Sequence, residues 1–352
     1  MSDYFAQRLK TARIINGLSM EDLSMRMNPA VSKQSISKYE QGKMMPSDSV
    51  LKALSEALDF PLDYFFRETP HIERLNFRSS GSLSAHSEAL MASLAQDRLE
   101  RYLALEELLV ICTTFTNPLK DWSPIRNFDE VEEAAVALRQ QWSLGRHPLQ
   151  SVYEMLESEG VKLIEFDAKD TRIDGFSTLA NGNIPLIVVN ESANATVERK
   201  RFTALHELAH LLLPLSGEFT PEQQERFCHR FAGAFLCPRP VFFEELGHHR
   251  TAFTLGELIS IRQRYGISIA ATVHRAKDLG IITDAYYNHI YNHHIHANPM
   301  EEGWGNFPLA EQTHRFERLL QRAVAEKIIT LSHAAELANE SESDYQQKIF
   351  RM

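Results

Sequence analysis

The sequence contains little cysteine, no excess of positive charge and no long hydrophobic run. Its three cysteines, Cys112, Cys228 and Cys237, cannot all pair within one chain, so we expect reduced thiols of the kind found in the cytoplasm. The formal net charge of −10 argues against a general basic coat for nucleic acid. The longest apolar run, near Leu103–Phe115, is too short to span a bilayer, and the N-terminal MSDYFAQRLK lacks the apolar core of a signal peptide. These absences predict a cytoplasmic protein without a membrane segment.

The most informative stretch that is present is Arg201–Leu213, RFTALHELAHLLL, which contains the pattern H-E-x-x-H. Residues four apart lie on one face of a helix, so His206 and His210 can direct two imidazoles at one point, which suits a tetrahedral Zn²⁺. Glu207 follows the first histidine and can reach water at the metal as a general base. A structural pair of histidines is the alternative. We favour the metal site because buried His pairs on an apolar helix are otherwise uncommon.

A catalytic zinc needs a third protein ligand, and the next helical stretch offers two candidates. The segment Pro221–Pro238, PEQQERFCHRFAGAFLCP, predicts a helix with Thr220 as its N-cap and proline at its first position. Glu225 and His229 are four residues apart and share a face of this helix. Either side chain could therefore reach the metal.

These two segments together resemble a known family. RFTALHELAHLLLP followed by ERFCHRFAGAFLCP is similar to the ImmA/IrrE-type zinc metallopeptidases, whose pattern is RFT-x-x-HE-x-x-H and then E-x-x-[AC]-[NH]-x-FA. The resemblance implies that His206, His210 and Glu225 bind zinc and that Glu207 is the catalytic glutamate. His229 stands where the family often has asparagine, which implies a place behind the ligands. Because imidazole also suits zinc, replacement of Glu225 by His229 stays open.

The N-terminal residues 3–66 predict four short helices separated by tight turns. Ser19 and Ser32 precede helical segments as N-caps, whereas Gly17 and Gly42 end helices. The Ser-Met-Glu-Asp-Leu start and the following VSKQSISKYEQGKMMPS resemble the XRE-type helix-turn-helix. That resemblance implies a DNA-binding domain whose recognition helix lies within Val31–Gly42.

The same resemblance implies which side chains face DNA. Five polar residues of the recognition helix could contact the major groove or its phosphates, namely Lys33, Gln34, Ser35, Ser37 and Lys38. The alternative is a module that only dimerises or docks a partner. Residues 1–70 hold nine Lys/Arg and nine Asp/Glu, and a neutral module gains little from phosphate contacts. We favour DNA binding because reading base edges needs only a few side chains.

The whole chain is predicted to have an α+β fold in two or three domains. An N-terminal all-α helix-turn-helix domain precedes a mainly helical, zincin-like metallopeptidase domain with a small sheet, as the resemblances imply. The small sheet is read from alternating or continuous apolar runs at Val161–Phe166, Gly175–Leu179 and Ile184–Asn190. The predicted ranges are 1–68 for the helix-turn-helix domain, 69–125 for a linker and helical connection, 126–283 for the metallopeptidase domain and 284–352 for a C-terminal helical extension.

Three further expectations concern single segments. Phe316–Ala338 is predicted to be one amphipathic helix. The histidine-rich Tyr286–His296 is predicted to be a polar surface helix or loop, although such a tract can bind metal incidentally. Arg199 and Arg201 are expected at the surface or behind the metal ligands.

Two functional readings from different classes follow. The first is a DNA-binding transcriptional regulator with a zinc-dependent endopeptidase domain, a hydrolase that uses Glu207 as its base. The family resemblance suggests cleavage of a specific regulatory protein, such as a repressor or antitoxin, or of the chain itself, in stress, mobile-element or defence control. The second is a non-proteolytic transcription factor that uses the zinc fold as a sensor or partner-binding scaffold. Glu207 favours the enzyme, since metal ligation alone does not require it. We expect duplex DNA and a protein substrate as partners, and a homodimer.

Overall fold

The computed structural model describes residues 2–66, 85–111, 114–166, 174–191 and 196–350. Of the predicted linker and helical connection, 69–125, residues 69–84 and 112–113 lie outside these ranges. The described chain divides into two compact units, one formed within residues 1–112 and 319–352 and the other within 113–318. None of the helices in the described ranges combines the length and apolar character that crossing a bilayer requires.

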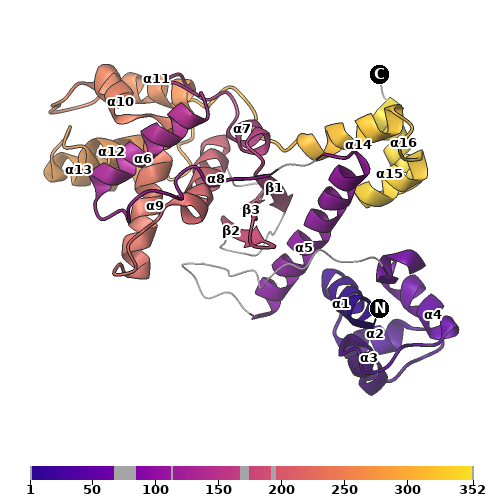
Figure 1. The fold of residues 1–352 in the computed structure, drawn as a ribbon. Coiled ribbons are helices and arrows are strands. Elements are labelled where there is room, and N and C mark those ends of the chain that lie inside the picture. Colours follow the sequence, from indigo (N-terminus) through magenta and orange to yellow (C-terminus); the bar gives the residue numbers. More distant parts are fainter. Residues whose placement is uncertain (1, 67–84, 112–113, 167–173, 192–195, 351–352) are drawn as a thin grey trace. The chain divides into compact units, whose positions relative to one another are not determined.

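In its described residues the first unit contains helices and no strand (Figure 1). Its elements are α1 (Ser2–Ile15), α2 (Met20–Arg26), α3 (Lys33–Glu40), α4 (Asp48–Leu58), the 3-10 helix η1 (Leu62–Phe66), α5 (Ala85–Leu108), most of α14 (Arg315–Ala325), α15 (Leu331–Ala338) and α16 (Glu342–Phe350).

The predicted helix caps of the N-terminal module are present. The Ser19 side chain accepts a hydrogen bond from the Asp22 backbone N–H, and the Ser32 side chain accepts one from that of Ser35. Gly17 and Gly42 both have positive φ angles, of 66° and 67°. An apolar core fills the space between α1, α2, α3, α4 and η1, and it includes Phe5, Leu9, Leu23, Ile36, Leu54, Leu58 and Phe65.

The C-terminal helices differ from the sequence prediction. Phe316–Ala338 was expected to be continuous, but the chain forms two helices, α14 and α15, with a turn between them. Lys327 in this turn has a φ of 59°, and the Thr330 side chain caps the first turn of α15. A single helix is therefore wrong, because a left-handed residue and an N-cap interrupt an otherwise periodic apolar pattern.

The second unit combines helices with one three-stranded sheet. Its elements are α6 (Phe128–Gln141), α7 (Val152–Ser158), β1 (Lys162–Phe166), β2 (Gly175–Ala180), β3 (Ile184–Asn190), α8 (Val197–Leu212), α9 (Pro221–Leu236), α10 (Arg239–Leu246), α11 (Leu255–Tyr265), α12 (Ile269–Asp278), α13 (Asp284–Ile290) and the π-helix η2 (Tyr291–Ile295).

The sheet supports the H-E-x-x-H helix. Its order is β1-β3-β2, with β1 parallel and β2 antiparallel to the central β3. Asn181 and Gly182, with φ of 52° and 73°, form the hairpin turn between β2 and β3, because a tight hairpin needs left-handed residues. Helix α8 packs on β2 and β3, while α9 packs against α8 and α6. The predicted mainly helical fold with a small sheet is confirmed.

Buried ion pairs lie within the apolar core of this unit. Glu132 on α6 accepts hydrogen bonds from both terminal nitrogens of Arg275 on α12, each at 2.8 Å. Arg262 on α11 lies 2.7 Å from Glu198 on α8, and Arg201 on α8 pairs with Glu311. Arg201 was expected at the surface or behind the metal ligands. Instead it is fully buried beside Glu311, with its guanidinium over the Phe307 ring.

The partners Phe307 and Glu311 belong to a segment without helix or strand, residues 296–314, which we call the C-terminal strap. The Glu311 carboxylate accepts hydrogen bonds from the backbone N–H groups of Val152 and Tyr153 at the start of α7. The carboxylate of Glu301 does the same at the start of α12. Two acids of one strap thus satisfy the open N–H groups of two helices.

Candidate metal centre and nucleic-acid interface

Helix α8 places the two histidines of the pattern one turn apart. It starts at the N-cap Thr196, whose side chain accepts from the Arg199 backbone N–H, and ends at Leu213. Its apolar residues are buried against the sheet and α9, including Ala204, Leu205, Leu208, Ala209 and Leu212. This packing fixes the opposite stripe of the helix, which carries His206 and His210.

Helix α9 supplies Glu225. The Thr220 side chain accepts from the Gln223 backbone N–H, and the Gln223 side chain accepts in return from the Thr220 backbone N–H. Pro221 occupies the first turn, as predicted. The capping box fixes where α9 begins and therefore which residue of its second turn faces α8.

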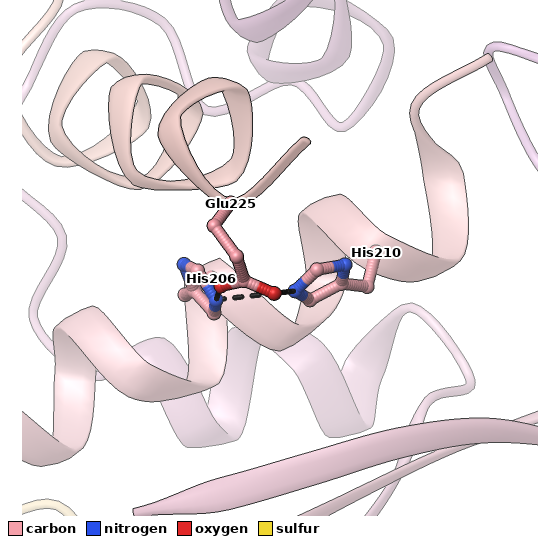
Figure 2. Close-up of side chains that lie close together, drawn as sticks. All are labelled: His206, His210 and Glu225. Carbon is pink, nitrogen blue, oxygen red and sulfur yellow. Dashed lines mark hydrogen bonds and ion pairs between the residues drawn. The ribbon is translucent and has the colours of Figure 1, made fainter. Parts of the chain in front are cut away.

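The three side chains point toward one another (Figure 2). Glu225 Oε2 lies 3.0 Å from His206 Nε2, and Glu225 Oε1 lies 3.3 Å from His210 Nε2. The two Nε2 atoms are 3.1 Å apart. Within the described ranges, this is the one group of three histidine, cysteine, aspartate or glutamate residues whose ligand atoms all lie within 4.8 Å of one another. Two imidazoles and a carboxylate that converge in this way could hold a metal ion.

Electrostatics favour the charged form of Glu225. Burial opposes ionisation, but the hydrogen bonds from His206 and His210 outweigh it and hold the pKa of Glu225 well below its usual range. An ionised carboxylate is the form in which glutamate binds a metal.

Glu207 lies next to this group on the sheet side. Its Oε2 accepts a hydrogen bond of 2.8 Å from the Ser177 hydroxyl on β2. Burial raises the pKa of Glu207, whereas His206, His210 and Ser177 act in the opposite direction. The approach of β2 to α8 depends on Gly175. A Cβ atom there would lie 2.8 Å from both Thr203 Cγ2 and the Val188 carbonyl oxygen.

Two further side chains surround the histidines. Cys228 Sγ lies 3.5 Å from His210 Nδ1, the ring nitrogen that faces away from Glu225. The His229 ring lies 4.4 Å from that of His206, centroid to centroid, and stacks on Phe202 at 5.8 Å. Part of the His229 side chain is exposed to solvent. Partial burial of its ring, followed by repulsion from a charged His206, lowers the pKa of His229 to about 4.

The structure brings four of the five residues expected at this site into one constellation. His206, His210 and Glu225 converge in a group that could hold a metal ion, and Glu207 lies beside them. His229 packs on the His206 ring without joining this group of three. Ser177 was missed by sequence reasoning. Its hydroxyl meets Glu207 across 30 positions, and no local pattern signals that contact.

Helix α3 lies within Val31–Gly42, the stretch expected to contain the recognition helix. Lys33, Gln34 and Lys38 are exposed on it, and Ser35 and Ser37 are half-buried. Ile36 and Tyr39 are in the core. Glu40 is held by Arg13 through two hydrogen bonds of 2.6 and 2.9 Å, which makes it structural. Lys33 Nζ lies 3.1 Å from Glu21, and both side chains are exposed, so the pair can open toward another partner.

The α8–α9 constellation packed on a small sheet is a candidate metal site, and the same chain carries a separate helical module at its N-terminal end. Comparison with protein families agrees with both parts. Residues 156–277 match the family described as the IrrE N-terminal-like domain, a peptidase family, and residues 9–65 match the helix-turn-helix family. The chain thus joins an IrrE/ImmA-like metallopeptidase domain to a helix-turn-helix DNA-binding domain. No curated protein matches the chain in a sequence comparison.

Proposed function

We propose that this protein is a DNA-binding regulator that cleaves a specific regulatory protein with a zinc-dependent endopeptidase site. The observation that carries the proposal is the convergence of His206, His210 and Glu225 directly beside Glu207. Two imidazoles and one carboxylate are a donor set typical of catalytic zinc, which keeps one position open. The ligand atoms face one another at 3.0 to 3.3 Å, so the set fits such an ion.

When bound, zinc would supply the Lewis acidity that polarises a peptide carbonyl and makes water reactive at neutral pH. Residues of the chain would transfer the proton and orient the groups around the metal. Glu207 accepts a proton from the attacking water and returns it to the leaving amine. The Ser177 hydroxyl holds Glu207 Oε2, which leaves the other carboxylate oxygen to carry that proton. Cys228 lies at His210 Nδ1 and supports the orientation of that ring.

The helix-turn-helix module would bring the peptidase to specific sites on DNA. Its exposed Lys33, Gln34 and Lys38, together with Ser35 and Ser37, would contact a duplex site through α3, with a homodimer on a palindromic sequence as the expected arrangement. A peptidase tied to an operator is suited to removing a repressor or antitoxin, or to cutting its own chain. Either event would change transcription in stress, mobile-element or defence control.

The proposal is tested with Glu207→Gln, which removes the base and keeps the metal ligands. Purified wild-type and variant chains, each loaded with zinc, are incubated with a lysate of the host cell, with and without duplex DNA. New protein N-termini are then labelled and identified, and the intact mass of the chain itself is followed. New termini that appear only with the wild type support the peptidase. Identical patterns for both chains would leave the zinc fold as a sensor or scaffold.

A further inference from the structure

A second cluster of imidazoles lies outside the site described above, on α13 and η2. Its members His289, His293 and His294 are all exposed. The rings of His289 and His293 lie 4.5 Å apart, centroid to centroid, and those of His289 and His294 lie 6.2 Å apart. The segment falls after residues 156–277, so the family match does not cover it.

Two of the three histidines, His293 and His294, lie in the π-helix η2. An α-helix of about 3.6 residues per turn aligns residue i+4 with residue i and carries residue i+5 away from that face. A π-turn closes i→i+5 bonds and so brings both i+4 and i+5 next to residue i. The His296 backbone N–H donates such a bond to the Tyr291 carbonyl at 2.8 Å. This wider winding begins at Tyr291, directly after α13, and within it the rings of His293 and His294 both lie near the ring of His289.

One hydrogen bond also prepares a ring nitrogen for a metal. His293 Nδ1 lies 2.9 Å from the His289 carbonyl oxygen. A carbonyl can only accept, so Nδ1 carries the proton, and the Nε2 of the neutral ring keeps its lone pair. Histidines that bind metals commonly donate their other N–H to a backbone carbonyl in this way.

We propose that His289 and His293, with His294 as a third donor, form a second site for a first-row divalent ion that prefers imidazole, of the class of Ni²⁺, Cu²⁺ and Zn²⁺. Imidazole nitrogen suits these ions, and a hard ion such as Mg²⁺ would not choose it. The ligand atoms of the three do not all lie within 4.8 Å. The exposed side chains close around the ion by rotating about their side-chain bonds, and water fills the remaining positions.

The test counts zinc bound to the full chain after equilibrium dialysis against buffered Zn²⁺. The wild type should hold about two ions, one in each site. His289→Ala/His293→Ala should hold about one and keep its fold, because both residues are exposed. His249→Ala, which removes a single exposed imidazole elsewhere, should still hold about two.

A fourth chain separates this proposal from the catalytic one. His206→Ala/His210→Ala should lose one ion and keep the other at the α13–η2 site. If His289→Ala/His293→Ala binds as much zinc as the wild type, the second site is refuted. If the wild type binds about one ion and His206→Ala/His210→Ala binds none, it is refuted as well. Failure of the catalytic site alone would appear as unchanged zinc in His206→Ala/His210→Ala.

Discussion

The helix-turn-helix module and the α8–α9 region are stabilised in different ways. The module packs an apolar core with one shielded ion pair, Arg13 with Glu40, and keeps Lys33, Gln34 and Lys38 of α3 in solvent. The α8–α9 region buries charged residues in pairs, such as Arg201 with Glu311 and Arg262 with Glu198. An exposed polar side chain of α3 can therefore be replaced with little effect on the stability of the module. A site built on α8 depends on ionic partners far away in the sequence.

The largest effect is expected at the metal centre. His206→Ala or His210→Ala should abolish zinc binding at this site, because two ligands of three do not hold a catalytic ion firmly. Glu225→Ala should weaken binding strongly as well. The measurement is zinc affinity by competition with a chelator. His229→Ala is the matched control on the same helix, and if it alone weakens binding, His229 is the third ligand in place of Glu225.

The next effect concerns the C-terminal strap. Glu311→Ala leaves the fully buried Arg201 without its carboxylate and opens the N-terminus of α7. Breaking a buried pair on one side typically costs about 3–5 kcal/mol of the free energy of unfolding. The unfolding transition of the second unit should shift accordingly in denaturant. Glu21→Ala breaks the exposed pair with Lys33 and should cost about 0–1 kcal/mol. If Glu311→Ala and Glu21→Ala lowered the free energy of unfolding equally, the buried pair would stabilise the protein no more than the exposed pair does.

A smaller effect is expected where β2 meets α8. Gly175→Ala would place a Cβ 2.8 Å from a backbone oxygen of β3, which cannot rotate away. Overpacking of this kind costs about 1–3 kcal/mol, and moving β2 would also take Ser177 from Glu207. The midpoint temperature of thermal unfolding and the peptidase rate should both fall. At Gly217 an added Cβ meets nothing within 4 Å, so Gly217→Ala should change neither.

The smallest effects on fold stability are expected at α3, where substitutions should change DNA binding instead. Lys33→Ala and Lys38→Ala should each weaken duplex binding evenly across sequences and reduce the salt slope of log K by about 0.9. Gln34→Ala should instead relax sequence preference by about 1–3 kcal/mol and leave the slope unchanged. Fluorescence anisotropy with operator and scrambled duplexes over a range of salt gives both quantities. A change of fold stability in these variants would contradict the view of α3 as a surface reader.

The sequence was sufficient where the determinants are local. Ser19, Ser32 and Thr220 cap helices that were predicted from their position before an apolar pattern. His206 and His210 were placed on one face by spacing alone. Distant contacts could not be predicted. Glu311 reaches Arg201 across 110 positions from a strap without periodicity.

The same reasoning explains the other departures. Ser177 lies on a short strand in which nothing marks it apart from its neighbours until β2 is packed on α8. The helix expected over Phe316–Ala338 failed because apolar periodicity continues through the turn at Lys327. Apolar periodicity shows which face of a segment is buried. It does not show the backbone conformation, so a turn at a left-handed residue can leave the periodicity unchanged.

The most direct test of the account is the environment of zinc at α8 and α9. X-ray absorption at the zinc edge would be measured on the full chain carrying His289→Ala/His293→Ala, so that the α13–η2 site does not contribute. A zinc ion held by His206, His210 and Glu225 should have a first shell of nitrogen and oxygen at about 2.0–2.2 Å that includes two imidazoles. A zinc–sulfur distance of about 2.3 Å, which would point to Cys228 as a ligand, or the absence of retained zinc would contradict it.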